Sequence, residues 1–273
     1  MTKALFILFV TLPFTLTLSV DAQRSRLPLI SAHRGASRLA PENTKASFLK
    51  AIDAGANFIE IDVRTTADGQ QVIVHDKSLK RTTGLNALVS ETDYATIKNS
   101  SAGSWFGKDF SEQRVPTLEE ICALVNSENK RRSSEVKLYV DCKAIDPLKV
   151  VSTLKKYELI DSAVFYGDLQ TLKNIKEQFS SARLLPSFPG IKQADAMLKT
   201  FNPYAFDVPF QELNESIVAY IHGKRIKVFS DLLEKDDHPN SYRKAVEYGI
   251  DLIQTDDVNA VKKIYTEFET HDK

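Results

Sequence analysis

A regular alternation of short apolar runs with helical stretches is the feature that most constrains the fold of this chain. Apolar runs of roughly four to eight residues bounded by turn residues are typical of buried strands. A helix between successive strands indicates a parallel sheet. The predicted strands cover residues 27–32, 57–63, 71–75, 136–143, 163–166, 183–186, 205–208, 226–230 and 251–255. The predicted helices cover residues 44–54, 117–127, 147–157, 169–179, 193–201, 214–222 and 241–248.

Nine predicted strands are one more than a (β/α)₈ barrel needs. Strands 57–63 and 71–75 are joined only by a short loop that contains Asp68-Gly69, which predicts a hairpin rather than a helical crossover. Without the hairpin arm, eight strands remain, and they predict an α/β fold of the TIM barrel type with its site at the C-terminal strand ends. A doubly wound open sheet is the alternative architecture.

A long segment after the hairpin does not fit a minimal barrel. Residues 77–116 contain Gly84, Gly103 and Gly107, together with Trp105 and Phe106. Long connections of this kind are usually functional insertions. The segment therefore predicts a small inserted cap subdomain beside the barrel mouth.

Several residues predict the ends of helices. Asn43 is expected to cap the helix at 44–54, and Thr117 with Glu120 forms a capping box for the next helix. Gly55 and Gly249 stand where glycine commonly ends a helix.

The first 22 residues are typical of a signal peptide. Lys3 precedes an apolar stretch over residues 4–20, and Val20-Asp21-Ala22 fits the small-x-small cleavage pattern. Cleavage near Ala22 leaves residues 23–273 as one exported domain, periplasmic or extracellular. An uncleaved membrane anchor is the alternative. No later segment approaches the roughly 20 apolar residues that span a bilayer, so no stable membrane insertion is expected.

Charge and cysteine content restrict the partners of the chain. Lys+Arg and Asp+Glu both total 36, and this balance gives no support for a nucleic-acid partner, which usually requires a basic excess. With two cysteines in the chain, zinc is not expected. Cys122 and Cys142 could form a disulfide in an exported protein or stay as two buried thiols.

Carboxylates follow one face of two predicted strands. Glu60 and Asp62 are two residues apart in 57–63, so they point to the same side. Asp141 and Lys143 share a face at the end of 136–143. A divalent cation on Glu60, Asp62 and Asp141 would relieve their repulsion, and Lys143 would neutralise an anionic substrate. Ordinary salt-bridged pairs are the alternative interpretation of both motifs.

Histidines and an arginine also fall at strand ends. His33 and Arg34 follow the first strand, and His75 ends the hairpin arm. Two imidazoles can act as general acid and base, and a guanidinium can grip a phosphate with two hydrogen bonds. A single such histidine is more often structural. The convergence of all these groups on the C-terminal strand ends predicts phosphodiester cleavage.

The order and spacing of these motifs resemble the glycerophosphodiester phosphodiesterase family. The likeness begins with His33-Arg-Gly35, Pro41-Glu-Asn-Thr44, Glu60-Ile-Asp62 and His75-Asp76. It continues through Leu79-Lys-Arg-Thr-Thr-Gly84, Gly103-Ser-Trp-Phe106 and Val115-Pro-Thr-Leu-Glu-Glu120, and it closes with Gly249-Ile-Asp251 and Thr255-Asp256. It therefore covers nearly all of residues 23–273.

The resemblance implies a TIM barrel with an insertion and a metal-dependent hydrolase that turns glycerophosphodiesters into an alcohol and sn-glycerol 3-phosphate. It implies one divalent cation, Mg²⁺ or Ca²⁺, on the three carboxylates, with His33 and His75 as the acid–base pair. It also implies that Arg34 and Lys143 contact the phosphate of this small-molecule substrate and that Glu42 stands beside the site.

The chain departs from the family pattern at several positions. Asp141 stands where members usually have Glu, while Phe165-Tyr166-Gly167 replaces a frequent Ser-Phe and Phe229 replaces a frequent Trp. The last two lie at predicted pocket positions, so they concern substrate identity. A phospholipase-D-like lyase that forms a cyclic phosphate from lysophospholipid or sphingomyelin is the enzymatic alternative, with Trp105, Phe106 and Phe110 as an apolar mouth. A barrel that only binds phosphorylated ligands is the non-catalytic alternative.

Overall fold

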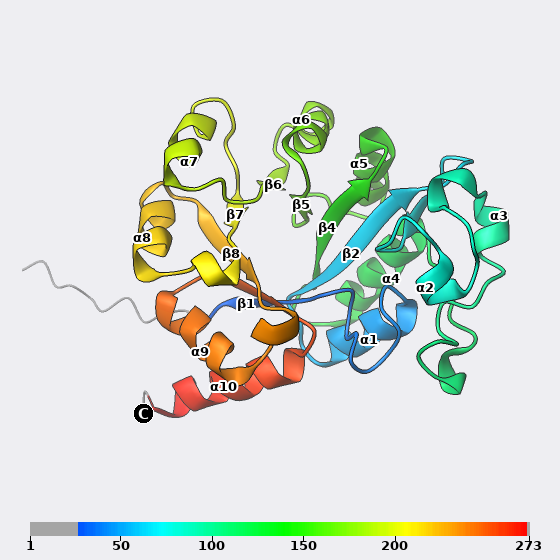
Figure 1. Ribbon diagram of the computed structural model, residues 1–273, viewed down its shortest axis with the longest axis horizontal. Coiled ribbons are helices and arrows are strands. Elements are labelled where there is room, and N and C mark those ends of the chain that lie inside the picture. Colours follow the sequence, from blue (N-terminus) through cyan, green and yellow to red (C-terminus); the bar gives the residue numbers. More distant parts are fainter. Residues whose placement is uncertain (1–26, 272–273) are drawn as a thin grey trace, which may run out of the picture.

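Eight parallel strands wrap into a barrel with helices on its outside (Figure 1). The computed structural model describes residues 27–271, so the predicted signal peptide lies outside the described residues. The barrel strands are β1 (Leu29–Ala32), β2 (Phe58–Thr65), β4 (Lys137–Ala144), β5 (Val164–Tyr166), β6 (Arg183–Leu185), β7 (Ala205–Asp207), β8 (Lys227–Asp231) and β9 (Leu252–Thr255). The helices around it are α1 (Lys45–Asp53), α4 (Leu118–Arg131), α5 (Pro147–Lys156), α6 (Leu169–Gln178), α7 (Ile191–Met197), α8 (Glu215–Gly223), α9 (Pro239–Tyr248) and α10 (Val258–His271).

The strands run in the order β6-β5-β4-β2-β1-β9-β8-β7, and the two end strands lie next to each other. The amide of Tyr204 donates to the carbonyl of Leu184 at 2.8 Å, and the amide of Phe188 donates to the carbonyl of Asp207 at 2.7 Å. These bonds make a nearly closed barrel. The TIM barrel prediction is therefore confirmed, and the open-sheet alternative is wrong.

The barrel interior has two kinds of layer. The inward positions further from the C-terminal mouth are apolar and pack together, at Phe58, Tyr139, Val164, Leu185, Ala205, Phe229 and Leu252. The inward positions two residues further along each chain segment are polar, at Ser31, Glu60, Asp141, Tyr166, Ser187, Asp207, Asp231 and Gln254. The apolar layer supports the barrel, whereas the polar layer faces the C-terminal mouth.

β3 (Gln71–Ile73) pairs antiparallel with β2 and lies off the barrel path. Gly69 takes φ of +79° in the connecting turn, a conformation that glycine adopts without strain. The hairpin prediction is confirmed, although the paired strand ends at Ile73 rather than at residue 75.

Residues 77–116 contain two short helices, α2 (Lys80–Thr83) and α3 (Tyr94–Ile97), beside the C-terminal end of β2 (Figure 1). Two 3₁₀ turns, Val89–Glu91 and Lys108–Phe110, complete the segment. A separate apolar cluster lies beneath it, formed by Val72, Val74, Leu79, Val89, Ile97, Ala102 and Val115. This segment thus has its own small core, built against β3.

Three aromatic residues of the segment, Trp105, Phe106 and Phe110, pack on one another rather than in that core. Trp105 meets Phe106 edge to face at 5.6 Å between ring centroids, and Phe106 meets Phe110 in the same way at 5.3 Å. Trp105 is 46% exposed. Gly103 allows this arrangement, because a Cβ there would collide with the carbonyl oxygen of Phe110.

The helix ends follow the sequence in part. The Thr117–Glu120 capping box is confirmed, and Gly249 ends α9 in the left-handed region. The prediction for Asn43 is wrong: Thr44 caps α1, because its hydroxyl accepts from the Ser47 amide. The Asn43 side chain is instead used in the site described below.

Two regions differ more from the predicted elements. α7 covers Ile191–Met197 rather than 193–201, and α10 has no predicted counterpart. Val258, Val261 and Ile264 are buried in α10, and their three-residue spacing is the helical signal that identifies it.

Cys122 in α4 and Cys142 in β4 are both buried free thiols. Both belong to the main core between strands and helices. Within residues 27–271, no helix combines the length and apolar character needed to cross a membrane.

Candidate active site

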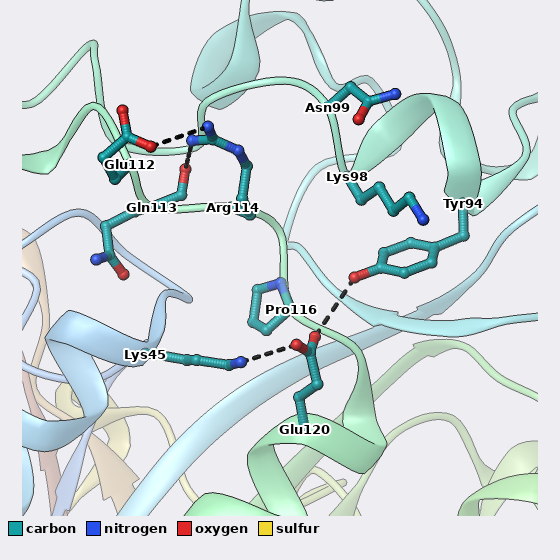
Figure 2. A pocket seen from close by; sticks show the side chains of 9 residues that line it. All are labelled: Lys45, Tyr94, Lys98, Asn99, Glu112, Gln113, Arg114, Pro116 and Glu120. Carbon is teal, nitrogen blue, oxygen red and sulfur yellow. Dashed lines mark hydrogen bonds and ion pairs between the residues drawn. The ribbon is translucent and has the colours of Figure 1, made fainter.

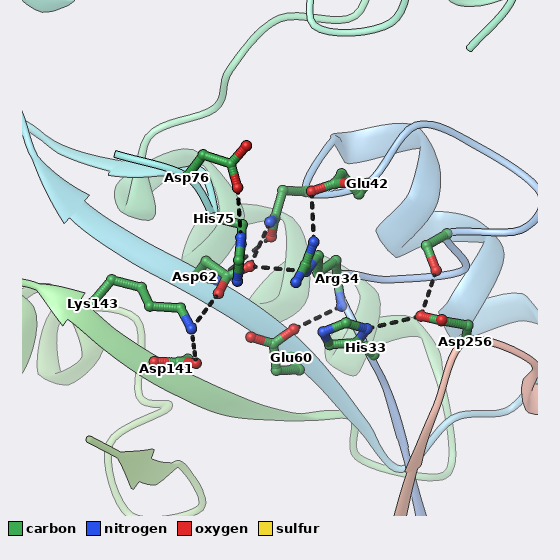
Figure 3. A network of polar contacts seen from close by, with 12 residues as sticks. His33, Arg34, Glu42, Glu60, Asp62, His75, Asp76, Asp141, Lys143 and Asp256 are labelled. Atoms are coloured by element: carbon green, nitrogen blue, oxygen red, sulfur yellow. Dashed lines mark hydrogen bonds and ion pairs between the residues drawn. The ribbon is translucent and has the colours of Figure 1, made fainter. Parts of the chain in front are cut away.

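Three carboxylates meet inside the C-terminal end of the barrel (Figure 3). Glu60 and Asp62 come from β2, and Asp141 comes from the neighbouring β4, where it pairs in register with Asp62. One oxygen from each lies within 4.8 Å of the others. Burial, followed by the charges of Asp62 and Asp141, raises the pKa of Glu60 well above its usual range. Burial and Asp62 likewise raise the pKa of Asp141. Such a trio of oxygen donors could hold a metal ion.

The turn after β1 holds two of these carboxylates in place. The Arg34 amide donates to Glu60 Oε2 at 2.7 Å, and Asn43 Nδ2 donates to Asp62 Oδ2 at 2.7 Å. Arg34 and Asn43 both have positive φ, 54° and 56°, which is uncommon outside glycine. The Asn43 amide donates to the Arg34 carbonyl at 3.0 Å. Gly35 completes the turn, since a Cβ there would press on Ser47.

Arg34 reaches across the site from this turn. Its Nη1 donates to Glu42 Oε1 at 3.0 Å, and its Nε stands 3.4 Å from Asp62 Oδ2. Arg81, from the segment at 77–116, binds both oxygens of Glu42 at 2.7 and 2.8 Å. Burial raises the pKa of Glu42, but the two guanidinium groups leave it below the ordinary value. Glu42 therefore fixes the position of Arg34.

His33 and Asp256 form one of two histidine–carboxylate pairs. His33 Nδ1 lies 2.8 Å from Asp256 Oδ1, which also accepts from Ser37 Oγ at 2.9 Å. Burial raises the pKa of Asp256, but the bond with His33 leaves it below its ordinary value. The ionised carboxylate holds the proton on Nδ1, so His33 Nε2 is the nitrogen left for exchange.

The second pair comes from the hairpin arm. His75 Nδ1 lies 2.7 Å from Asp76 Oδ1. Arg81 Nε donates to Asp76 Oδ2 at 2.6 Å, and chiefly through this bond the pKa of Asp76 falls well below its usual range. Arg64 in β2 donates from Nη2 to the His75 carbonyl at 2.6 Å. His75 is thus fixed both by its ring and by its backbone.

Lys143 lies beside the acidic trio. Its Nζ is 2.6 Å from Asp141 Oδ2 and 3.5 Å from Asp62 Oδ1. Burial lowers the pKa of this amine, but Asp141 more than offsets the effect, so the net change is a rise. The raised pKa keeps the ammonium group charged, and the side chain, 25% exposed, is accessible from the mouth.

The structure brings every predicted site residue into one cluster (Figure 3), namely His33, Arg34, Glu42, Glu60, Asp62, His75, Asp141 and Lys143. Sequence reasoning gave no site role to Asp256, Asp76 or Arg81, and it expected Asn43 only as a helix cap. Asp76 follows His75 directly and Asp256 follows the last barrel strand, so strand-end position was a usable signal for both. Arg81, in the short helix α2, and Asn43, in the turn after β1, act through long-range contacts that periodicity does not reveal.

A cavity of about 400 Å³ lies away from this cluster, where residues 94–116 meet α1 and α4 (Figure 2). There Lys45 Nζ contacts Glu120 Oε1 at 2.7 Å, and the Tyr94 hydroxyl donates to Glu120 Oε2 at 3.4 Å. Glu120 is also the capping-box residue of α4. These contacts connect the segment at 77–116 to the barrel, so the cavity lies at the interface between the two.

Known proteins resemble this chain over most of its length. A glycerophosphodiester phosphodiesterase of Caldanaerobacter subterraneus is 27% identical over 241 residues, which cover 86% of this chain and 98% of the relative. One from Bacillus subtilis is 29% identical, with 87% of each chain covered. A phosphodiesterase of Oleispira antarctica, solved with the product sn-glycerol-3-phosphate, superposes with a TM-score of 0.78 at 25% identity, over 88% of this chain and 97% of that one.

The sequence profile of the Glycerophosphoryl diester phosphodiesterase family matches residues 33–260. The matched region starts at His33 and includes all the clustered residues above. Together with the barrel and its acidic, histidine-flanked mouth, this match shows that the chain is a phosphodiesterase enzyme belonging to the glycerophosphoryl diester phosphodiesterase family.

Proposed function

We propose that this enzyme hydrolyses glycerophosphodiesters to an alcohol and sn-glycerol 3-phosphate. The observation that carries the proposal is the pair of histidine–carboxylate contacts, His33–Asp256 and His75–Asp76, placed around one acidic trio. The Oleispira relative was solved with the product sn-glycerol-3-phosphate, which supports a small-molecule substrate of this class. No observation favours the cyclising lyase or the binding-only barrel.

We propose that Glu60, Asp62 and Asp141 hold one divalent cation, Mg²⁺ or Ca²⁺. The residues fit such an ion: all donors are carboxylate oxygens, which hard cations prefer. Two of the carboxylates also carry raised pKa values because burial and mutual repulsion disfavour their charge. When bound, the cation supplies positive charge that stabilises phosphate oxygens in the transition state.

The two histidines move protons in the proposed reaction. Each ring is held at Nδ1 by a carboxylate, so each presents Nε2 to the substrate. One imidazole takes a proton from the attacking water, and the other gives a proton to the oxygen of the departing alcohol. The phosphorus–oxygen bond to that alcohol breaks as the new bond to the water oxygen forms.

Arg34 and Lys143 bind the phosphate in this scheme. Arg34 is aimed by Glu42, and Lys143 is placed between two of the carboxylates. Both cations stabilise charge on the phosphoryl oxygens. Because these positions are set before substrate arrives, little reorganisation is needed in the transition state.

Release of glycerol 3-phosphate tests the proposal. The purified enzyme is incubated with glycerophosphocholine and glycerophosphoethanolamine, with EDTA, and after adding back Mg²⁺ or Ca²⁺. Metal-restored release is expected. A cyclic phosphate in the phosphorus NMR spectrum, or release that EDTA leaves unchanged, would contradict the scheme.

We also propose that residues 1–22 are a signal peptide and that the enzyme is exported. The support is the sequence pattern that ends at Val20-Asp21-Ala22. N-terminal sequencing of the enzyme recovered outside the cytoplasm should begin near Gln23. A chain that begins at Met1 would contradict cleavage.

A further inference from the structure

The half of the mouth opposite the histidines contains polar groups that the proposed reaction does not use. Tyr166 ends β5, Asp207 ends β7 and Asp231 ends β8. Two residues before each of them, Val164, Ala205 and Phe229 pack in the apolar layer inside the barrel. Because side chains alternate along a strand, Tyr166, Asp207 and Asp231 also point inward, in the polar layer nearer the C-terminal mouth.

One carboxylate oxygen of Asp207 lacks the partner that a buried polar atom normally has. Its Oδ1 is buried and accepts no hydrogen bond from residues 27–271. The residue as a whole is half-buried, and burial followed by the charges of Asp231 and Asp141 raises its pKa well above the usual range. A buried polar atom without a partner is costly. A positively charged ligand would remove that cost.

Asp231 lies beside Asp207 and connects it to the catalytic side. Gln254 Nε2 donates to Asp231 Oδ1 at 2.8 Å. Burial raises the pKa of Asp231 to about 6, and the charges of His33 and Lys143 limit the rise. Gln254 Oε1 in turn accepts from Ser31 Oγ in β1 at 3.1 Å, two residues before His33, so Asp231 lies toward the catalytic side of the mouth. A group bound at Asp231 and Asp207 would therefore be attached closely to the phosphate.

Aromatic rings complete this side of the mouth. The Tyr166 ring lies 6.2 Å from that of Tyr139 between centroids, and its hydroxyl is 3.0 Å from Ser187 Oγ. Aromatic faces combined with carboxylates favour ammonium groups, including quaternary ones. A second metal site is less suitable: within residues 27–271, the one acidic trio close enough to share an ion is Glu60, Asp62 and Asp141.

We propose that Asp207, Asp231 and Tyr166 bind the cationic head group of the substrate, so that the enzyme prefers glycerophosphodiesters of ammonium alcohols such as choline and ethanolamine. The inference rests on the proposed function. The phosphate lies toward Arg34 and Lys143, and the ammonium group lies toward β7 and β8. The carboxylates then keep their charge because the ligand neutralises it.

Matched substrates test the charge directly. Glycerophosphocholine is compared with its uncharged analogue, the glycerophosphodiester of 3,3-dimethylbutanol, which replaces the ammonium nitrogen by carbon. The wild-type enzyme should show a higher kcat/KM for the choline ester. Asp207→Asn should lower kcat/KM for the choline ester about tenfold to a hundredfold, the range expected for losing a charged contact. The uncharged ester should change less than about threefold.

Asp195→Asn is the matched control, since Asp195 is an exposed carboxylate in α7 that pairs with Lys224, and neither ester should be affected. Equal losses of both esters in Asp207→Asn would overturn the proposal, as would a wild-type preference for the uncharged ester or for a polyol ester such as glycerophosphoglycerol. Thermal melting of each variant identifies one that fails to fold, in which case Asp231→Asn provides the same comparison.

Calorimetric titration with choline separates this inference from the proposed function. If the enzyme cleaves no glycerophosphodiester yet binds choline in an Asp207-dependent manner, the proposed function fails and the cation subsite stands. If cleavage occurs without any charge preference and choline does not bind, the subsite fails and the proposed function stands.

Discussion

The two halves of the barrel mouth differ in how their charges are satisfied. Around β1, β2 and β4, His33 and His75 each have a carboxylate, Arg34 has an acidic partner and Lys143 contacts two acids. Across the mouth, Asp207 has a buried oxygen without a partner, and Asp231 has an amide as its hydrogen-bond donor. In the first half, the charged groups already have partners in the free protein. In the second half, the proposed cationic ligand supplies the missing partner.

This difference separates chemistry from selection. Groups that transfer protons or bind the phosphoryl oxygens gain from being fixed before the reaction, because no energy is then spent on reorganisation. Groups that choose a head group gain from being unsatisfied without it, because the wrong ligand leaves them unpaired. The predictions below test the fixed half first and the unsatisfied half last.

Removing an imidazole should have the largest effect. His33→Ala and His75→Ala each delete a proton-transfer group, so kcat should fall about a hundredfold to ten-thousandfold with thermal stability nearly unchanged. His222→Ala, at the end of α8 and outside the site, is the matched control and should retain full turnover. Steady-state kinetics on glycerophosphocholine measures the effect. A His33→Ala enzyme within a few-fold of wild type would remove that ring from the scheme.

Removing one member of the acidic trio should abolish metal dependence. In Glu60→Gln, the repulsion among buried carboxylates decreases, so the metal-free protein should become more stable while divalent cations lose their effect. Thermal melting in EDTA, and again with Mg²⁺ or Ca²⁺, measures both changes. Glu112→Gln, at a highly exposed carboxylate, serves as the control. Equal metal-induced stabilisation of Glu60→Gln and wild type would place the ion elsewhere.

Asp256→Asn should have an intermediate effect, because it keeps the His33 ring but removes the charge that orients it. We expect kcat to fall about tenfold to a thousandfold, by analogy with loss of a histidine-orienting carboxylate. The acidic limb of the pH–rate profile should also move, which loss of structure alone would not cause. Asp257→Asn, one position along the chain, is the neighbouring control. An unchanged pH profile would show that Asp256 only supports the fold.

Sequence periodicity was sufficient for the barrel and for most of the fixed half of the site. Strand ends carry His33, Asp62 and Lys143, and alternation places side chains inward or outward without any knowledge of distant contacts. The contact between β6 and β7 depends on hydrogen bonds from loop amides to the strand carbonyls of Leu184 and Asp207. No local sequence pattern encodes these bonds. The sequence therefore predicted which residues face the mouth before it could predict how they pair.

Long-range pairing explains what the sequence left out. Asn43 had a plausible local role as a helix cap, but Thr44 takes that role and Asn43 binds Asp62 instead. Asp207 and Asp231 stand at strand ends like the predicted ligands, yet the role proposed for them depends on the unpartnered oxygen of Asp207. Such an absence can be seen only when the surrounding side chains are placed.

The smallest expected effect concerns the charge of Asp231. Its pKa of about 6 in the folded protein lies above the ordinary 3.8, so between these pH values the folded state binds a proton that the unfolded state does not. Stability is then lost as pH rises through that window, and the full cost is present above pH 6. Asp231→Asn removes this cost. In EDTA, the free energy of unfolding of the variant relative to wild type should therefore be about 2 kcal/mol higher at pH 8 than at pH 4.

Asp195→Asn should show the opposite sign, because its hydrogen bond with Lys224 lowers the pKa of Asp195, and the charge therefore favours folding above the ordinary pKa. Urea denaturation of both variants and wild type at pH 4 and pH 8 measures the comparison. Asp231→Asn that is less stable than wild type at pH 8 would mean that the free protein already stabilises this charge. The half of the mouth formed by β7 and β8 would then be as fully satisfied as the half that carries the histidines.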